Sequence, residues 1–177
     1  AAGPLPAPAR PTATDIAPVV MIHGCAADAA GWMPLEKALG RDRPILKLEL
    51  PGHGRSPAQA LRGFPDLVAH MRRAFDSLDL AAAHLVGHSL GGAVALALAD
   101  TRPRTVRSLS LISPAGLGPE IDGAAIKGIA TASRVESLAP WLSRLMGDPK
   151  SLSWSFAQAA MLGRGDPALR AAQVEMA

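Results

Sequence analysis

The stretch Leu85-Val86-Gly87-His88-Ser89-Leu90-Gly91-Gly92 decides the fold of this chain. An apolar run ends in Gly-x-Ser-x-Gly, and an alanine-rich helical pattern follows directly, so the order is strand, sharp turn, helix. Such a turn strains the backbone of Ser89, and glycines on both sides leave room for it because they have no Cβ. The hydroxyl then stands above the N-terminus of the next helix, where backbone N–H groups stabilise an oxyanion. The sequence therefore predicts a nucleophilic serine.

The base that would activate this serine is missing from the sequence. A serine hydroxyl is a weak nucleophile without a base. All five histidines precede Ser89: His23, His53, His70, His84 and His88. With this turn, the catalytic residues run along the chain in the order serine, acid, histidine. We therefore read the chain as part of a longer enzyme, cut before its acid and histidine, and expect no turnover by these residues alone.

The composition is that of one globular domain, with 177 residues, 49% of them hydrophobic and 19% charged. The net charge of +3 comes from scattered arginines without interleaved aromatics, which argues against nucleic-acid binding. No apolar stretch reaches the roughly 20 residues that a membrane span needs. Cys25 is the single cysteine, which suits a reducing compartment, so we expect a cytoplasmic location.

Short apolar runs alternate with helical patterns along most of the chain. The expected strands are 19–22, 45–50, 84–86 and 106–113, and the expected helices between them are 32–39, 65–78 and 93–100. This alternation predicts an α/β fold, a parallel sheet with helices on both faces. Three segments follow: residues 1–18 as an Ala/Pro-rich linker or frayed terminus, 19–119 as the core, and 120–177 as a helical cap.

The cap prediction depends on helical patterns without a convincing strand. These patterns cover 124–132, 138–146, 151–162 and 168–176. The alternative is that these helices simply flank the sheet.

Three loops follow predicted strands and would meet at the carboxyl edge of the sheet, where ligands bind. They are the turn around Ser89, His23-Gly24-Cys25-Ala26 and Pro51-Gly52-His53-Gly54-Arg55-Ser56. Gly24 is expected to let the chain turn sharply, so that the Cys25 N–H points at a substrate oxygen. The Leu90 N–H would be the second donor to that oxygen.

The other residues of these loops receive supporting roles. The imidazole of His23 is expected to hydrogen-bond loop backbone, and His53 to pack within its own loop. His23, Gly24 and His88 are expected to line the substrate site. His88 cannot serve as the base, because two neighbours on one sharp turn cannot face the same atom. No histidine has metal-ligand spacing with a second histidine or a carboxylate, so we expect no metal site.

The sequence does not identify the catalytic acid. Glu120 and Asp122 follow the fourth expected strand and are the only acids placed to approach the site. The alternative for both is a surface charge at the base of the cap.

Residues 83–95, together with Leu111-Ile112-Ser113-Pro114-Ala115-Gly116-Leu117-Gly118-Pro119-Glu120-Ile121, carry a family resemblance. They resemble the α/β-hydrolase family, and within it the hydrolase-type domain of the dihydrolipoamide acetyltransferase subunit of acetoin dehydrogenase complexes. The resemblance implies Ser89 as nucleophile, Cys25 and Leu90 at the oxyanion hole, and a cap that starts at Ile121. It also implies a lipoyl domain upstream and dehydrogenase-complex subunits as partners. No cofactor is expected on this segment, and the lipoyl group and coenzyme A are expected as substrates.

Three functions remain open from the sequence. The first is acyl transfer to coenzyme A through an acyl-Ser89 intermediate, with a small molecule or an acyl carrier as substrate. The second is a generic serine hydrolase that cleaves an ester or a carbon–carbon bond with water. The third is a non-catalytic hydrolase-like module that serves as a scaffold.

Overall fold

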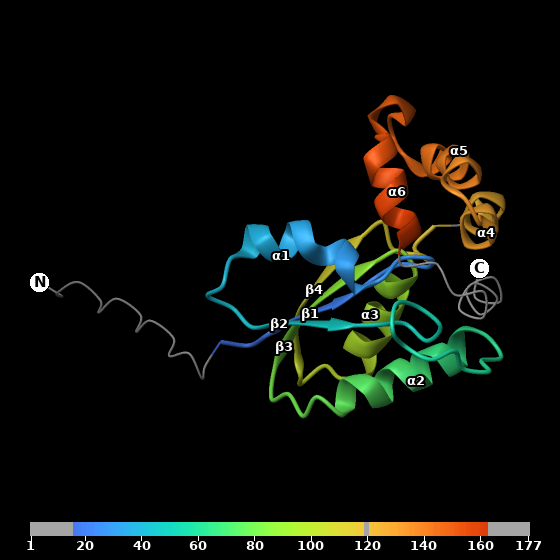
Figure 1. Ribbon diagram of the computed structural model, residues 1–177. Coiled ribbons are helices and arrows are strands. Elements are labelled where there is room, and N and C mark those ends of the chain that lie inside the picture. The colour runs from blue at the N-terminus through green and yellow to red at the C-terminus, as the bar shows by residue number, and fades with distance from the viewer. Residues whose placement is uncertain (1–15, 119–120, 163–177) are drawn as a thin grey trace, which may run out of the picture.

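Four parallel strands form one sheet in the computed structural model, which describes residues 16–118 and 121–162. The strands are β1 (Val19–Ile22), β2 (Ile45–Leu48), β3 (Ala83–His88) and β4 (Val106–Ile112), and their order across the sheet is β2-β1-β3-β4 (Figure 1). The predicted parallel sheet is confirmed. β1 has the expected bounds, whereas β2 ends before Glu49 and β3 continues to His88.

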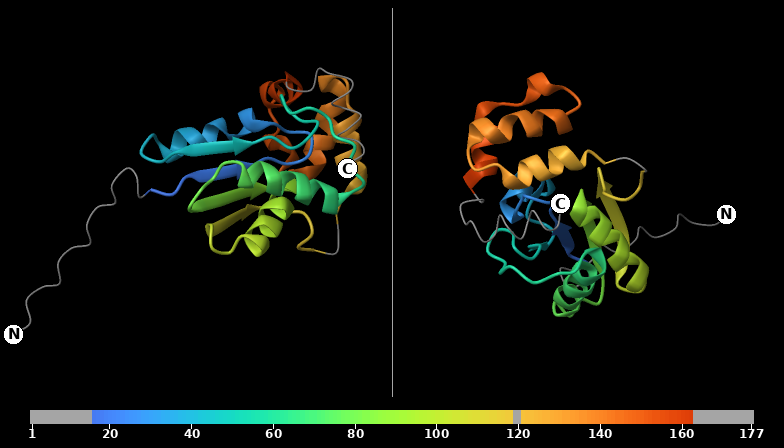
Figure 2. Two further views of the ribbon diagram at one scale, coloured as in Figure 1. Left: turned by 90° about the horizontal axis from the view of Figure 1, so that it is seen from below. Right: turned by 90° about the vertical axis from the view of Figure 1, so that its right-hand side faces the viewer.

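Helices cover both faces of this sheet (Figures 1 and 2). The 3₁₀ turn η1 (Ala29–Trp32) and α1 (Met33–Leu39) lie on one face, and α2 (Phe64–Asp76) and α3 (Leu90–Thr101) lie on the other. Successive side chains of β1 point to opposite faces of the sheet, as in any β-strand. Val20 and Ile22 belong to the core under α2 and α3, while Met21 packs with Trp32.

The larger core lies under α2 and α3 because both helices present apolar side chains to the sheet. Leu67, Met71 and Phe75 recur every four residues of α2 and are each at most 2% exposed. The preceding residue, Gly63, has a φ of 118°, which suits glycine, and Pro65 stands in the first turn, where no N–H is needed. This packing fixes β3 and the start of α3, between which Ser89 lies.

A separate helical layer lies beyond the carboxyl ends of the strands (Figures 1 and 2). It consists of α4 (Gly123–Thr131), α5 (Val135–Leu145), the 3₁₀ turn η2 (Pro149–Ser151) and α6 (Trp154–Leu162). The cap has its own apolar cluster around Ile129, Ala132 and Leu138, and Ala26 of the loop after β1 packs against that cluster. The fourth expected cap helix, 168–176, and residues 1–15 of the expected linker lie outside the described residues.

Candidate active site

Ser89 occupies a strained turn between β3 and α3. Its φ of 52° and ψ of −122° lie outside the regions that L-residues prefer, as predicted. Backbone hydrogen bonds hold the turn, because the Ser89 N–H donates to Ile112 O at 3.0 Å. Ser89 O accepts from the N–H groups of Gly92 at 2.9 Å and Ala115 at 3.0 Å. The end of β4, the loop after it and the first turn of α3 therefore fix the position of the serine.

Two glycines make this turn sterically feasible. A Cβ on Gly87 would lie 2.6 Å from both Gly91 O and Gly92 Cα. A Cβ on Gly91 would overlap the carbonyl oxygens of Ile22 and His23 at the end of β1. Neither glycine has a positive φ, so neither is needed for an unusual backbone conformation. Both are needed because neighbouring atoms, mostly of the backbone, come too close for a Cβ.

The two groups that the chemistry needs stand at the N-terminus of α3. Ser89 is half-buried, and its hydroxyl has no hydrogen-bond partner among the described residues. The Leu90 N–H is the first N–H of α3, and it has no hydrogen-bond acceptor among the residues that the structure describes. Such unpaired N–H groups and the helix dipole favour negative charge at this point.

The loop after β1 forms a tight turn against Ser89. The Ala27 N–H donates to Gly24 O at 3.3 Å, with Cys25 and Ala26 at the corners of the turn. The turn begins at Gly24, but its residue with a positive φ is Ala26, at 58°. Glycine is needed at position 24 for space, because a Cβ there would lie 3.0 Å from the Ser89 Cβ.

His88 forms the other side of this contact. A Cβ on Gly24 would lie 2.8 Å from His88 Nδ1, so the imidazole packs directly on the loop. Partial burial of the ring and the nearby charge of His23 lower the pKa of His88. The role of His88 and Gly24 in lining the substrate site stays a prediction.

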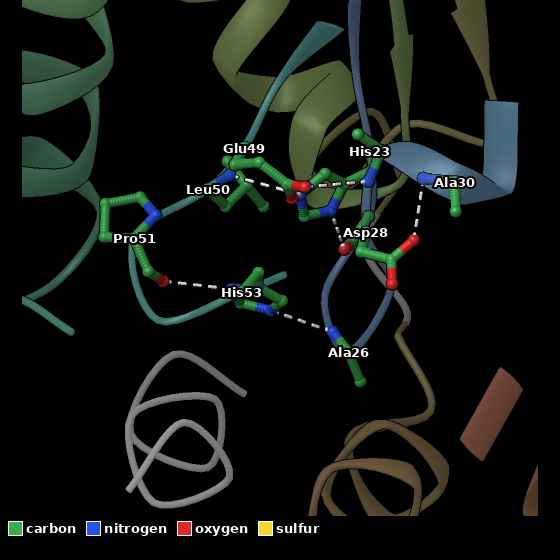
Figure 3. A network of polar contacts seen from close by, with 10 residues as sticks. His23, Ala26, Asp28, Ala30, Glu49, Leu50, Pro51 and His53 are labelled. Carbon is green, nitrogen blue, oxygen red and sulfur yellow. Dashed lines mark hydrogen bonds and ion pairs between the residues drawn. The ribbon is translucent and has the colours of Figure 1, made fainter. Parts of the chain in front are cut away.

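His23 is a buried structural residue at the end of β1 (Figure 3). Its Nδ1 lies 2.8 Å from Gly24 O, and its Nε2 lies 3.1 Å from the Leu50 N and 2.9 Å from Glu49 Oε2. The predicted bonds to loop backbone are confirmed. The side chain is 3% exposed and both ring nitrogens are occupied by protein groups, so we correct the expectation that His23 contacts substrate.

Glu49 is the functional-site neighbour that sequence reasoning missed. Ile22 pairs with Leu48 across β1 and β2, so the residues that follow them, His23 and Glu49, lie level with each other. Glu49 Oε1 also accepts from the Ala29 N–H at 3.3 Å. Burial opposes ionisation of this carboxyl, but contacts with His23 and the Ala29 N–H outweigh it, so its pKa is lowered.

A lowered pKa in the folded state makes the stability contribution of Glu49 pH-dependent. The ionised carboxylate stabilises the fold above the pKa of the unfolded state, and that contribution is lost as pH falls through the lower pKa of the folded state. We expect Glu49→Gln to lower the free energy of unfolding at pH 7, and the difference from wild type to shrink under acidic conditions. Urea titrations at several pH values measure this, and a gap that does not change with pH would contradict it.

Two further predicted residues have clear structural partners. His53 is fully buried and packs in the loop after β2, as predicted; its Nε2 accepts from the Ala26 N–H at 2.9 Å.

Asp122 is the N-cap residue of α4, where its Oδ1 accepts from the Ala125 N–H at 2.9 Å and its Oδ2 pairs with Arg144 at 2.7 Å. Asp122 is therefore a helix cap and not the catalytic acid, while Glu120 lies outside the described residues.

Two kinds of feature are absent from the part of the chain that the structure describes. No three His, Cys, Asp or Glu side chains in residues 16–118 and 121–162 come together as a metal site would require. None of the described helices combines the length and the apolar character needed to cross a bilayer.

Comparison with known proteins shows the family. The alpha/beta hydrolase fold family matches residues 17–172. The chain is 42% identical over 133 residues to the dihydrolipoyllysine-residue acetyltransferase component of the acetoin cleaving system of Pseudomonas putida, covering 75% of this chain and 36% of that protein. It is 36% identical over 105 residues to 2-hydroxymuconate semialdehyde hydrolase of Pseudomonas sp. (strain CF600), covering 56% of this chain and 37% of that protein. The chain thus spans about a third of the length of these relatives.

A solved structure agrees on the fold. The 2-hydroxy-6-oxo-6-phenylhexa-2,4-dienoate hydrolase of Rhodococcus sp. strain RHA1 superposes with a TM-score of 0.75 at 21% identity, covering 90% of this chain and 62% of that one. At this identity the likeness concerns the fold alone. The resemblance to acetoin-system acetyltransferase components is also confirmed by the match to the Pseudomonas putida protein. This chain belongs to the α/β-hydrolase fold family.

Proposed function

We propose that Ser89 is the nucleophile of an acyltransferase that moves an acetyl group between thiols, as part of an acetoin-cleaving system. The observation that carries the proposal is the strained backbone of Ser89, with a φ of 52°, at the N-terminus of α3 and against the loop after β1. The similarity to the Pseudomonas putida acetyltransferase component supports the choice of a thioester over an oxygen ester.

The reaction has two matched halves. Ser89 Oγ attacks the thioester carbonyl carbon while a base outside the described residues takes its proton. The negative oxygen accepts hydrogen bonds from the Leu90 N–H and the Cys25 N–H, then the carbon–sulfur bond breaks and the departing sulfur takes the proton. A second thiol attacks acyl-Ser89 in the same way and restores the hydroxyl. One oxyanion donor contributes about 3 kcal/mol to such a transition state.

The substrates and partners follow from this assignment. A lipoyl group would deliver the acetyl and coenzyme A would accept it, so neither is a resident cofactor. A lipoyl domain and the dehydrogenase subunits of the complex would be the protein partners, in the cytoplasm. The Pseudomonas putida relative, a component of an acetoin cleaving system, supports these substrates and partners.

The acceptor decides the test. The full-length protein is given acetyl-dihydrolipoamide and coenzyme A, and the formation of acetyl-coenzyme A is followed. We expect transfer to coenzyme A to be much faster than release of acetate to water. Release of acetate at an equal rate without coenzyme A would overturn the transferase assignment.

A hydrolase is the second candidate, and one observation favours it. The relative from Pseudomonas sp. (strain CF600) is a semialdehyde hydrolase and matches more than half of this chain. A hydrolase would use Ser89 and the same oxyanion donors with water as the acceptor. Rapid hydrolysis of a short-chain p-nitrophenyl ester in the absence of coenzyme A would support it.

A further inference from the structure

His53 joins the loop after β2 to the loop after β1 (Figure 3). The loop after β1 lies against Ser89 at Gly24, where a Cβ would come within 3.0 Å of the Ser89 Cβ. The Ala26 N–H donates to His53 Nε2 at 2.9 Å, and His53 Nδ1 lies 3.0 Å from Pro51 O. The side chain of His53 is completely buried. This part-buried, directional bond joins two residues that are 27 positions apart in the chain, and it restrains one loop relative to the other.

These two bonds define the protonation of the ring. A backbone carbonyl only accepts, so Nδ1 must carry the proton that is donated to Pro51 O. A backbone N–H only donates, so Nε2 must offer a lone pair to Ala26. His53 can satisfy both partners only as the neutral imidazole with its proton on Nδ1, and a second proton on Nε2 would oppose the Ala26 N–H.

The backbone that His53 holds is strained. Ala26 has a φ of 58° at the second corner of the Gly24–Ala27 turn, a place where glycine is preferred. Such strain persists only where surrounding contacts over-determine the conformation. The Ala26 side chain packs on the cap cluster. Ala26 is thus fixed by His53 on its N–H and by the cap on its side chain.

The Ala26 N–H that His53 holds belongs to the peptide bond between Cys25 and Ala26. If the turn relaxes and this peptide rotates, the neighbouring N–H of Cys25 changes direction as well. A misplaced donor loses most of its value, since an oxyanion donor must stand about 3 Å from the position of the developing charge.

We propose that His53 is a positioning residue for the oxyanion hole: its neutral imidazole fixes the strained turn that aims the Cys25 N–H at the substrate oxygen. The inference rests on the proposed function of Ser89. His53 acts through the loop and touches no reacting atom. Its effect is therefore on the rate of the chemical step and not on the binding of the substrate ground state.

Two amide substitutions in the full-length protein separate the two bonds of the ring. His53→Asn retains an N–H donor near Nδ1 for Pro51 O but is too short to reach Ala26. His53→Gln is one carbon longer and can place its amide oxygen near Nε2, where it accepts from the Ala26 N–H. We expect His53→Asn to lower kcat about 10- to 100-fold with KM unchanged, and His53→Gln to recover most of that loss.

A transition-state probe gives the second readout. A trifluoromethyl ketone analogue adds to Ser89 and forms a tetrahedral oxyanion, so its affinity should fall in His53→Asn by the same factor as kcat/KM. Substrate affinity should not change. Equal activity of the two variants and the wild type, or equal loss in both with no selective loss of the probe, would overturn the inference.

Separate controls distinguish a loss of folding, and a failure of the proposed role of Ser89, from a failure of the inference about His53. Thermal unfolding shows whether the variants are folded, and ¹⁵N spectra of the wild-type imidazole show its tautomer without any substitution. A His53 that is protonated on Nε2 would overturn the inference even if both variants failed to fold. Full activity of Ser89→Ala would overturn the proposed function itself, whereas an inactive Ser89→Ala beside a fully active His53→Asn would overturn only the role of His53.

Discussion

Ser89→Ala is expected to abolish acetyl transfer and leave the protein folded. Loss of a serine nucleophile from a triad costs about 10⁶-fold in kcat, because the remaining groups have no atom to acylate. The hydroxyl has no hydrogen-bond partner among the described residues, and alanine bears the φ of 52° no worse than serine does. The free energy of unfolding should therefore stay close to that of the wild type.

The covalent intermediate gives this experiment a direct readout. Wild-type protein mixed with the acetyl donor alone should gain one acetyl group on the peptide that contains Ser89, which mass spectrometry detects. Ser110→Ala, at an exposed serine of β4, is the matched control and should acetylate normally. Undiminished transfer by Ser89→Ala would exclude Ser89 as the nucleophile and reopen the scaffold interpretation.

The order of strands and helices could be predicted because hydrophobic periodicity is a local property of the sequence. The ends of the elements were less predictable, as β2 and α3 show. The alternation Leu46, Leu48, Leu50 predicts a strand through residue 50, yet Leu50 is buried in a loop and gives its N–H to His23. Helix α3 begins at Leu90, ahead of the predicted residue 93, because its glycines are retained for close packing in spite of their low helix propensity.

Some features of the site depend on neighbouring residues in the sequence, and others depend on contacts between distant ones. The strain at Ser89 is encoded in five consecutive residues, so the motif alone predicted it. The contacts among His23, Glu49 and His53 depend on β1 pairing with β2, which brings together loops that are far apart in the sequence. Had the register Ile22 to Leu48 been known, the His23–Glu49 pair would have followed directly from it.

Gly91→Ala should lower the free energy of unfolding more than Glu49→Gln or Ser89→Ala does. Its Cβ would overlap the carbonyl oxygens of Ile22 and His23, and these are backbone atoms that cannot move aside without disrupting the end of β1. Overpacking of this kind costs typically 1–3 kcal/mol, and a clash with backbone places the expected loss near the upper end, about 3 kcal/mol. Urea unfolding measures the loss.

Gly31→Ala is the control for this substitution, because a Cβ at Gly31 in η1 would have no atom within 4 Å. Its effect should be within about 0.5 kcal/mol of the wild type. Gly91 stands two residues after Ser89, so any relief of its clash must move α3 away from β1 and with it the Leu90 N–H. The fraction of Gly91→Ala that remains folded should therefore be less active per folded molecule than the wild type. Equal stability of the two glycine variants would mean that α3 does not meet the end of β1 as closely as the structure has it.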